Sequence, residues 1–132
     1  MKNNEKSLQM ACVQWLRLQY PHVWVGNFST DTRYGGTQTQ RALQGAIKNK
    51  MGYTKGLPDL AILQPSGMFH ALFVEFKTDK GRQSAEQKEF QKYALENSYL
   101  YVVVRNLDEF TFFVKNYFNG KDVINYQLDI WK

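Results

Sequence analysis

Apolar side chains recur every three or four positions in four segments of the chain, which is the spacing of amphipathic helices. The first helix is predicted over residues 5–19 and ends before Pro21, because the residue that precedes a proline avoids the helical region. Its apolar stripe comprises Leu8, Ala11, Cys12, Trp15 and Leu18. The second helix is predicted over residues 38–50, with a narrower stripe formed by Leu43, Ala46 and Ile47.

Two later helices begin with capping signals. Ser84, followed three residues later by Gln87, has the form of a capping box and predicts a helix that runs to about Glu96. Asn106 is expected to cap a last helix, with Glu109 three residues further on. The apolar stripe of that last helix comprises Leu107, Phe110, Phe113, Val114, Tyr117 and Phe118.

Four short segments rich in β-branched and aromatic residues are predicted to be strands, namely residues 22–28, 60–63, 69–77 and 99–105. The last of these is almost continuously apolar, which is typical of a buried central strand. Residues 29–37 are interpreted as a loop, and the tail 121–132 is ambiguous, with an edge strand as one interpretation. The order α-β-α-β-β-α-β-α predicts an α/β fold in which helices flank a mixed central sheet.

The second and third strands form a predicted hairpin whose register brings charged residues together. A turn centred on Gly67 places Asp59 opposite Glu75, with Lys77 on the same face. Directly opposed residues have Cβ atoms about 4.5–5.5 Å apart, so two carboxylates there are destabilising unless a cation compensates them. A hard divalent cation such as Mg²⁺ suits these oxygen ligands. The alternative is a pair of ordinary solvated charges at the end of a hairpin.

The composition agrees with a single soluble domain over residues 1–132. Apolar residues make up 43% of the chain, which is enough for a core, and no apolar segment reaches the length of a membrane span. The N-terminal residues lack the apolar core of a signal peptide. The lone Cys12 excludes an internal disulfide and a cysteine-based zinc site. We therefore expect a cytoplasmic protein.

The formal net charge of +5 fits a polyanionic partner. The lysines and arginines are unevenly distributed along the chain. Two basic segments flank the predicted charged hairpin in the sequence. Basic side chains that neutralise phosphates position DNA without reading its bases. The residues that we assign to DNA binding are Arg33, Arg41, Lys48, Lys50 and Lys55 of the first segment, with Lys80 and Arg82 of the second. The alternative is a set of solvated surface charges.

Three motifs carry a resemblance to a known family: residues 56–60 (Gly-Leu-Pro-Asp-Leu), 74–77 (Val-Glu-Phe-Lys) and 81–87 (Gly-Arg-Gln-Ser-Ala-Glu-Gln). In this order, with the predicted elements around them, they resemble the virus-type replication-repair nuclease (VRR-NUC) domain of the PD-(D/E)XK nuclease superfamily. The resemblance covers most of the chain and implies a restriction-endonuclease-like core. It also implies a DNA endonuclease that depends on Mg²⁺ or Mn²⁺.

The same resemblance implies roles for individual residues. Asp59 and Glu75 correspond to the metal-binding carboxylates, and the backbone carbonyl of Phe76 is expected to join them as a ligand. Lys77 corresponds to the catalytic lysine, whose charge suits a water nucleophile or a developing phosphate charge. An ordinary lysine at the end of a strand is the structural alternative for Lys77.

Two further residues correspond to family positions and also have structural explanations. Gln87 corresponds to the motif glutamine, and it would equally complete the capping box with Ser84. Glu5 corresponds to the acidic residue of the first helix, which in this superfamily reaches the metal through water. A glutamate in a first helical turn is also favoured by the helix dipole.

Family members that consist of this domain alone tend to form homodimers and to act on branched DNA such as four-way junctions. The resemblance therefore implies a structure-specific endonuclease with a second copy of the chain as partner. A non-catalytic module that binds branched DNA on the same fold is the main alternative. A third interpretation is a carboxylate-pair hydrolase such as a glycosidase, which the basic charge and Lys77 disfavour.

Overall fold

The structure is a computed structural model that describes residues 2–29 and 35–120. Its helices and strands follow the predicted order. The helices are α1 (Lys2–Gln19), α2 (Gln38–Lys50), α3 (Ala85–Glu96) and α4 (Leu107–Phe118). The strands are β1 (Val25–Asn27), β2 (Leu60–Ile62), β3 (Leu72–Phe76) and β4 (Leu100–Val104). Ser84 and Asn106 are the N-caps of α3 and α4, as predicted. The ambiguous tail 121–132 lies outside the described residues.

The strands form one mixed sheet in the order β1-β2-β3-β4. The β1–β2 and β2–β3 pairs are antiparallel, and the β3–β4 pair is parallel. In the β2–β3 hairpin, Leu60 pairs with Val74, which confirms the predicted register about Gly67. Extending this register by one residue puts Asp59 directly opposite Glu75.

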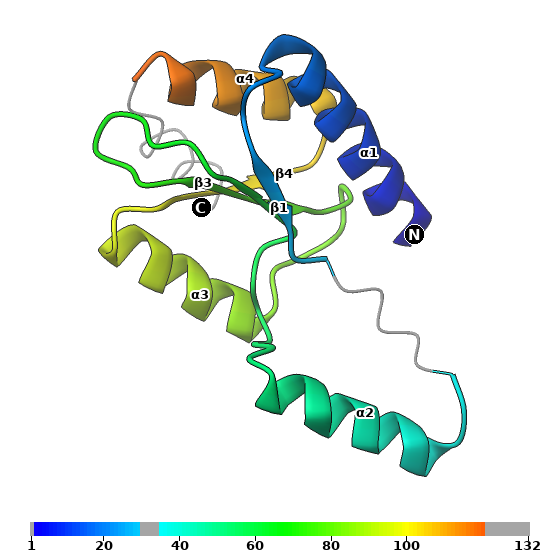
Figure 1. The fold of residues 1–132 in the computed structure, drawn as a ribbon. Helices are drawn as coiled ribbons and strands as arrows, with labels where there is room; N and C mark the ends of the chain where they lie inside the picture. Colours follow the sequence, from blue (N-terminus) through cyan, green and yellow to red (C-terminus); the bar gives the residue numbers. More distant parts are fainter. Residues whose placement is uncertain (1, 30–34, 121–132) are drawn as a thin grey trace.

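Helices cover both faces of the sheet (Figure 1). On one face, α1 and α4 pack over a core that includes Leu72, Val74 and Phe76 of β3. On the other face, α3 packs over Phe73 and its neighbours. Because side chains alternate along a strand, Glu75 shares the α3 side of β3 with Phe73. Glu75, a charged residue, therefore lies on the face of the sheet that α3 covers.

The position of β4 differs from the prediction that it is a central strand. Among the described strands it is the last in the sheet order, although its whole length is buried. It is buried because α3 packs against one of its faces and α4 against the other. A continuous apolar run therefore indicates that both faces are covered, and it does not distinguish a central strand from a terminal one.

The buried side of α1 is rotated relative to the predicted apolar stripe. Cys12 and Leu16 are fully buried, whereas Ala11 and Leu18 of the predicted stripe are exposed. Leu16 lies one turn beyond Cys12 and therefore shares its face, and Leu18 points about 200° away from Leu16 around the helix. The prediction for Leu18 was wrong because Leu16, four residues after Cys12, is the residue that packs into the core.

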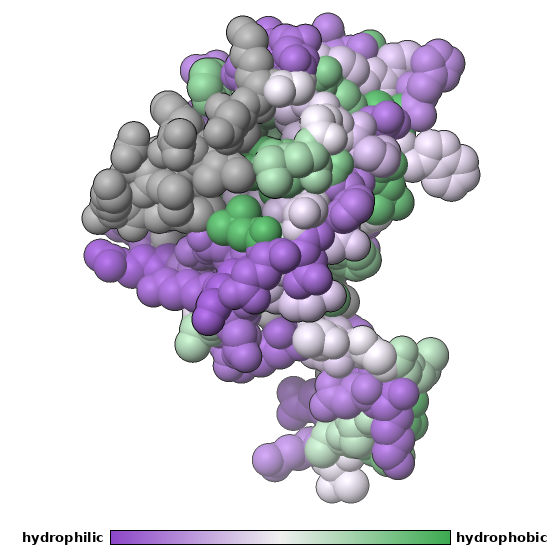
Figure 2. All heavy atoms as spheres, turned by 90° about the vertical axis from the view of Figure 1, so that its left-hand side faces the viewer, coloured by the Kyte–Doolittle hydropathy of each residue, from purple (hydrophilic) through white to green (hydrophobic). Residues whose placement is uncertain are grey.

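Helix α2 projects from the body, and its apolar stripe does not join the core (Figure 1). None of its residues is buried, and Leu43 is 61% exposed. In the space-filling view α2 forms a lower lobe that a narrow neck connects to the main body (Figure 2). Its helical start is secured locally, since Thr37 and Gln40 form a capping box.

Candidate active site

Asp59 is held at the end of the hairpin by hydrogen bonds on both sides. Its main-chain carbonyl accepts the N–H of Phe28 at 2.9 Å, which extends the pairing of β1 with β2. Its carboxylate oxygen Oδ2 accepts the N–H of Phe76 at 2.8 Å. The N–H and C=O of a strand residue point to the same side, so the Phe76 carbonyl is also directed toward Asp59. The sheet thus brings one carboxylate and one carbonyl oxygen to the same edge.

A glycine turn delivers Asp59 to this position. Gly56 has a φ of 98°, and a Cβ atom there would lie 2.6 Å from the main-chain oxygen of Glu86 in the first turn of α3. Only glycine combines this backbone conformation with such a close approach. The segment before β2 can therefore cross the start of α3, where Lys55 and Glu86 form an ion pair at 3.5 Å.

Glu75 is the buried charge of the site. It is only 3% exposed, and the Nζ atom of Lys77 lies 3.8 Å from its Oε2 atom. Its other oxygen, Oε1, is buried and has no hydrogen-bond partner among the described residues. Burial first, and then the neighbouring Asp59 carboxylate, raise the pKa of Glu75 to about 9, while the charge of Lys77 opposes the shift. The site therefore lacks positive charge to match its carboxylates.

This arrangement fits a hard divalent cation. The described residues contain no cluster of three or more His, Cys, Asp or Glu side chains suited to a metal, so the site is a carboxylate pair. Mg²⁺ is commonly bound by one or two carboxylates and keeps several waters, which agrees with Asp59, Glu75 and the Phe76 carbonyl. The unpartnered Oε1 of Glu75 is the observation that favours a cation here, because a buried acceptor without a partner is costly.

Glu5 and Gln87 lie at the border of this site. Glu5 is in the first turn of α1, and its charge contributes to the raised pKa of Glu75. Gln87 is engaged in the capping box, since its Oε1 atom accepts the N–H of Ser84 at 2.8 Å. The capping role of Gln87 is therefore confirmed, and its role in the site stays a prediction. Glu5 and Gln87 line the same cleft as Asp59.

The cleft lies between α1 and the segment 48–57, which comprises the end of α2 and the loop after it, and it has a volume of about 1470 Å³. Asp59 is one of its lining residues, and α1 contributes one face at helical spacing. The basic residues that line it are Lys6, Arg17, Lys48 and Lys55. The cleft beside Asp59 therefore has walls that carry positive charge, which favours anionic ligands.

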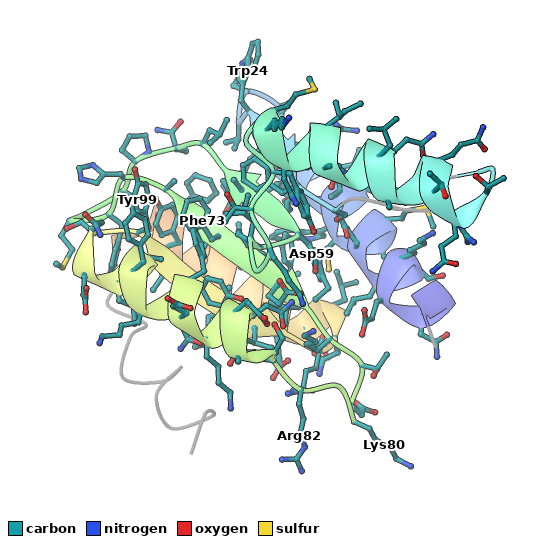
Figure 3. The ribbon with its side chains drawn as sticks, turned by 90° about the horizontal axis from the view of Figure 1, so that it is seen from below. Trp24, Asp59, Phe73, Lys80, Arg82 and Tyr99 are labelled. Atoms are coloured by element: carbon teal, nitrogen blue, oxygen red, sulfur yellow. The ribbon has the colours of Figure 1, made fainter. Side chains whose placement is uncertain are left out.

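The predicted DNA-binding residues are distributed unequally around this cleft. Lys48 and Lys55 line it, whereas Arg41 and Lys50 are exposed on α2 outside its lining. Lys80 and Arg82 follow β3 and extend outward on the opposite side of Asp59 from α2 (Figure 3). Arg33 lies outside the described residues. Two basic segments therefore flank Asp59 in space as well as in the sequence.

Sequence reasoning missed the basic residues of α1. Lys6 and Arg17 line the cleft together with Gln9 and Gln14, at intervals that keep them on one side of the helix. Their helical spacing was visible in the sequence, but nothing there indicated that this side of α1 would face the site. The wall of the cleft depends on how α1 packs over the sheet.

The sequence analysis also did not identify Tyr101 of β4 and Arg105, which directly follows β4, as residues near the site. Tyr101 is fully buried on the α3 side, and its hydroxyl has no hydrogen-bond partner among the described residues. Burial, and then the charge of Glu75, raise the pKa of Tyr101. Arg105 stabilises the loop after Lys77, since its guanidinium donates to the Gly81 carbonyl at 2.8 Å. Both residues are far from the motifs in sequence and reach the site through the parallel β3–β4 pairing.

The fold and the charged hairpin end define a restriction-endonuclease-like class: a mixed sheet, helices on both faces, and a carboxylate pair beside a lysine. A search of solved structures finds a similar chain described as a "VRR_NUC domain protein". The TM-score is 0.70 at 20% identity, and the match covers 90% of this chain and 91% of the other. The protein therefore has the VRR-NUC fold.

Comparisons of sequence do not add a relative. No family model matches the chain, and no curated protein matches it. Among the described helices, none has the length and apolar character needed to cross a membrane.

Proposed function

We propose that the protein is a DNA endonuclease that hydrolyses phosphodiester bonds with Mg²⁺ or Mn²⁺ as cofactor. The observation that carries this proposal is the buried Glu75, with Asp59 opposite and Lys77 beside it, at the end of a hairpin in a nuclease fold. The basic cleft that opens at Asp59 supports a nucleic-acid substrate. The proposed substrate is branched DNA such as a four-way junction.

Each proposed site residue has a distinct task. Asp59 and Glu75 would hold the cation together with the Phe76 carbonyl, and Glu5 would support it from the first turn of α1. Such a cation would supply Lewis-acid chemistry to the water nucleophile and to the phosphate. Lys77 orients the attacking water or stabilises the charge that develops on the phosphate. In the reaction the water oxygen bonds to phosphorus and gives up one proton, one P–O ester bond breaks, and the leaving oxygen takes up one proton.

Gln87 and the basic residues complete the proposed machinery. Gln87 supports Lys77 or the phosphate from the first turn of α3. Lys48 and Lys55 neutralise phosphates in the cleft, and Lys80 and Arg82 contact the duplex on the other side of Asp59. These contacts position DNA without selecting its sequence.

We propose that a two-fold homodimer is the active form on four-way junctions. Cutting such a junction symmetrically requires two active sites, and a second copy of the chain supplies the second one. Light scattering of the purified protein, alone and with a junction, tests this part of the proposal. A mass of one chain in both conditions would contradict it.

Cleavage of defined DNA substrates tests the enzymatic proposal. We expect the purified protein to cut a four-way junction in Mg²⁺ or Mn²⁺, and to cut a flap or a linear duplex less well. Asp59→Ala and Lys77→Ala are each expected to lower the rate by about 100-fold or more, as loss of a charge-stabilising group does. Lys92→Ala is the matched control, because Lys92 is exposed on α3 outside the cleft lining and forms an exposed ion pair with Glu96 in the next turn.

The outcomes separate the proposal from its main alternative. No cleavage of any substrate, or full activity in Asp59→Ala and Lys77→Ala, would contradict the endonuclease proposal. Junction binding that persists in chelator, with no nicking at any metal concentration, would instead indicate a non-catalytic binding module.

A further inference from the structure

The cleft beside Asp59 is lined by apolar and aromatic side chains as well as by cations. They lie on α1, on the end of β1 and on the segment after α2, and they stay exposed: Met10 (66%), Leu18 (72%), Phe28 (42%), Met51 (83%) and Tyr53 (36%). Exposed apolar side chains that gather in one cleft are typical of a binding site. The cleft is therefore built for a ligand with apolar faces.

The charge of the cleft specifies the ligand further. Four of its lining residues are basic, and the acidic ones among the described lining residues are Glu5 and Asp59, both at the candidate metal site. The ammonium group of Lys48 lies 4.9 Å from the ring centroid of Tyr53, so one cation and one aromatic face are presented together. A ligand that complements this cleft would be anionic along its length and would present apolar faces.

An unpaired DNA strand has both properties, and a duplex has only one of them. A duplex presents its phosphates and keeps its base faces stacked inside, so it would leave the apolar lining uncovered. Proteins that bind single strands combine a basic groove with aromatic side chains on which bases stack. We propose that this cleft binds a single-stranded segment of DNA, with Phe28 and Tyr53 as stacking surfaces, and leads it to Asp59.

This inference rests on the proposed function, and it assigns the unpaired region of a branched substrate to the α1 side of the site. Binding in the presence of a chelator tests it without requiring cleavage. We expect a fluorescein-labelled oligothymidine to bind more tightly than a blunt duplex of equal length, as measured by fluorescence anisotropy. Tyr53→Ser and Phe28→Ser should each weaken oligothymidine binding by about 5-fold to 100-fold, the range for loss of one stacked base.

Matched variants make the result specific. Tyr53→Trp keeps a stacking surface and should retain binding, and Tyr93→Ser removes an aromatic residue that is 55% exposed on α3 outside the cleft. The inference is overturned if duplex and oligothymidine bind equally in the wild type, or if Tyr53→Ser has no more effect than Tyr93→Ser. It is also overturned if light scattering shows that Tyr53→Ser abolishes a dimer, because a second copy then occupies the cleft. Binding without any cleavage would contradict the proposed nuclease and leave this inference standing.

A second, independent observation concerns two buried oxygen atoms. Oε1 of Glu75 and the hydroxyl of Tyr101 both lack a hydrogen-bond partner among the described residues. Tyr101 pairs with Phe73 across the parallel strands, so it lies on the face of Glu75, two residues before the partner of Glu75 on β4. Burial and then the charge of Glu75 raise the pKa of the Tyr101 hydroxyl, whereas the side chain of Gln83 lowers it.

A buried hydroxyl that makes no hydrogen bond destabilises the fold. Such a group is explained if it forms a hydrogen bond in another state of the protein, such as a metal-bound one. The hydroxyl of Tyr101 can donate, and the ionised carboxylate of Glu75 can only accept. We infer that Tyr101 is a positioning residue for the metal site, donating a hydrogen bond to one oxygen of Glu75 so that the other faces the cation. Partners of this kind commonly change metal affinity by about 10-fold to 100-fold when removed.

The variant Tyr101→Phe removes only this hydroxyl. We expect its affinity for Mn²⁺, measured by isothermal titration calorimetry, to fall by about 10-fold or more. Its thermal unfolding temperature in chelator should be unchanged or higher, because the lost hydroxyl makes no hydrogen bond there. Tyr117→Phe is the control: the Tyr117 hydroxyl is buried and donates to the Gln64 carbonyl, so this variant should lose stability and keep its Mn²⁺ affinity.

Two outcomes contradict the inference in distinguishable ways. If the wild type binds Mn²⁺ and Tyr101→Phe binds it equally well, the positioning role of Tyr101 is wrong and the proposed metal centre stands. If the wild type binds no Mn²⁺, both the metal centre and the role of Tyr101 are wrong.

Discussion

At the scale of single residues, the protein keeps one carboxyl group in a place where its charge is poorly compensated. Glu75 is buried on the sheet, with the Asp59 carboxylate opposite it and the Lys77 ammonium as the compensating cation within the described part of the chain. Such an arrangement destabilises the ionised protein, and functional sites are where it persists. The same residues that weaken the metal-free fold are those that a cation would stabilise.

The raised pKa of Glu75 predicts how stability depends on pH. Glu75 has a pKa of about 9 in the folded chain and an ordinary value of 4.5. Between these two pH values the folded chain keeps the Glu75 proton, whereas the unfolded chain has lost it. Its contribution to stability is therefore fully present below pH 4.5 and is lost as the pH rises through 9. In chelator, we expect the difference in free energy of unfolding between wild type and Glu75→Gln to fall as the pH rises from 4.5 to 9.

Urea unfolding at several pH values measures this difference, and subtracting the variant removes the titration of other groups. A difference that stays constant across the range would show that Glu75 ionises at its ordinary pKa. Because a cation requires the ionised carboxylate, Mn²⁺ should stabilise the wild type more as the pH rises.

At the scale of the elements, the site depends on a short segment between α2 and β2 as much as on the strands themselves. That segment turns at Gly56, passes the first turn of α3 and brings Asp59 to Phe76. Helix α2, in contrast, buries none of its residues and is held by its own capping box. The turn therefore couples the position of Asp59 to α3, whereas α2 contributes no buried residue to the core.

Substitution of Gly56 tests the importance of this turn. Gly56→Ala should destabilise the protein by about 1–3 kcal/mol, because a side chain there meets both an unfavourable φ and the backbone of Glu86. Gly45→Ala is the matched control, since Gly45 lies within α2 with no atom near its added Cβ. That change should stabilise the protein by about 0.5–1 kcal/mol. Equal unfolding curves for the two variants would contradict the account of the turn.

At the scale of the whole molecule, the positive charge is arranged around an acidic centre. Cations of α1 and of the 48–57 segment line the cleft on one side of Asp59, and Lys80 and Arg82 extend on the other. DNA that crosses the site would meet positive charge before and after the carboxylates. Such binding depends on counterion release, so it weakens as salt rises.

Arg17 provides a specific test, because only the tertiary structure places it in the cleft. We expect Arg17→Ala to reduce the slope of log affinity against log salt by about 0.7 when binding of single-stranded DNA is measured in chelator. Lys92→Ala, which removes an exposed cation of α3 outside the cleft lining, should leave the slope unchanged. The same reduction in both variants would mean that the cleft is not the DNA surface.

The sequence by itself determined the order of the elements and the meeting of Asp59 with Glu75. These features depend on local sequence. The spacing of apolar residues indicates helices and strands, and the position of one turn sets the register of a hairpin. The start of α3 at Ser84 and that of α4 at Asn106 were predictable for the same reason, because a cap and its partner lie within one turn.

Only the tertiary structure decided which side of α1 is buried, where β4 lies in the sheet and what lines the cleft. Leu16 replaced Leu18 in the core, and Arg17 reached the cleft, because the angle at which α1 crosses the sheet sets both. Tyr101 came beside Glu75 through parallel pairing, whose partners are joined by a whole helix rather than a turn. Contacts of this kind depend on packing between distant segments, and no periodicity along the chain records them.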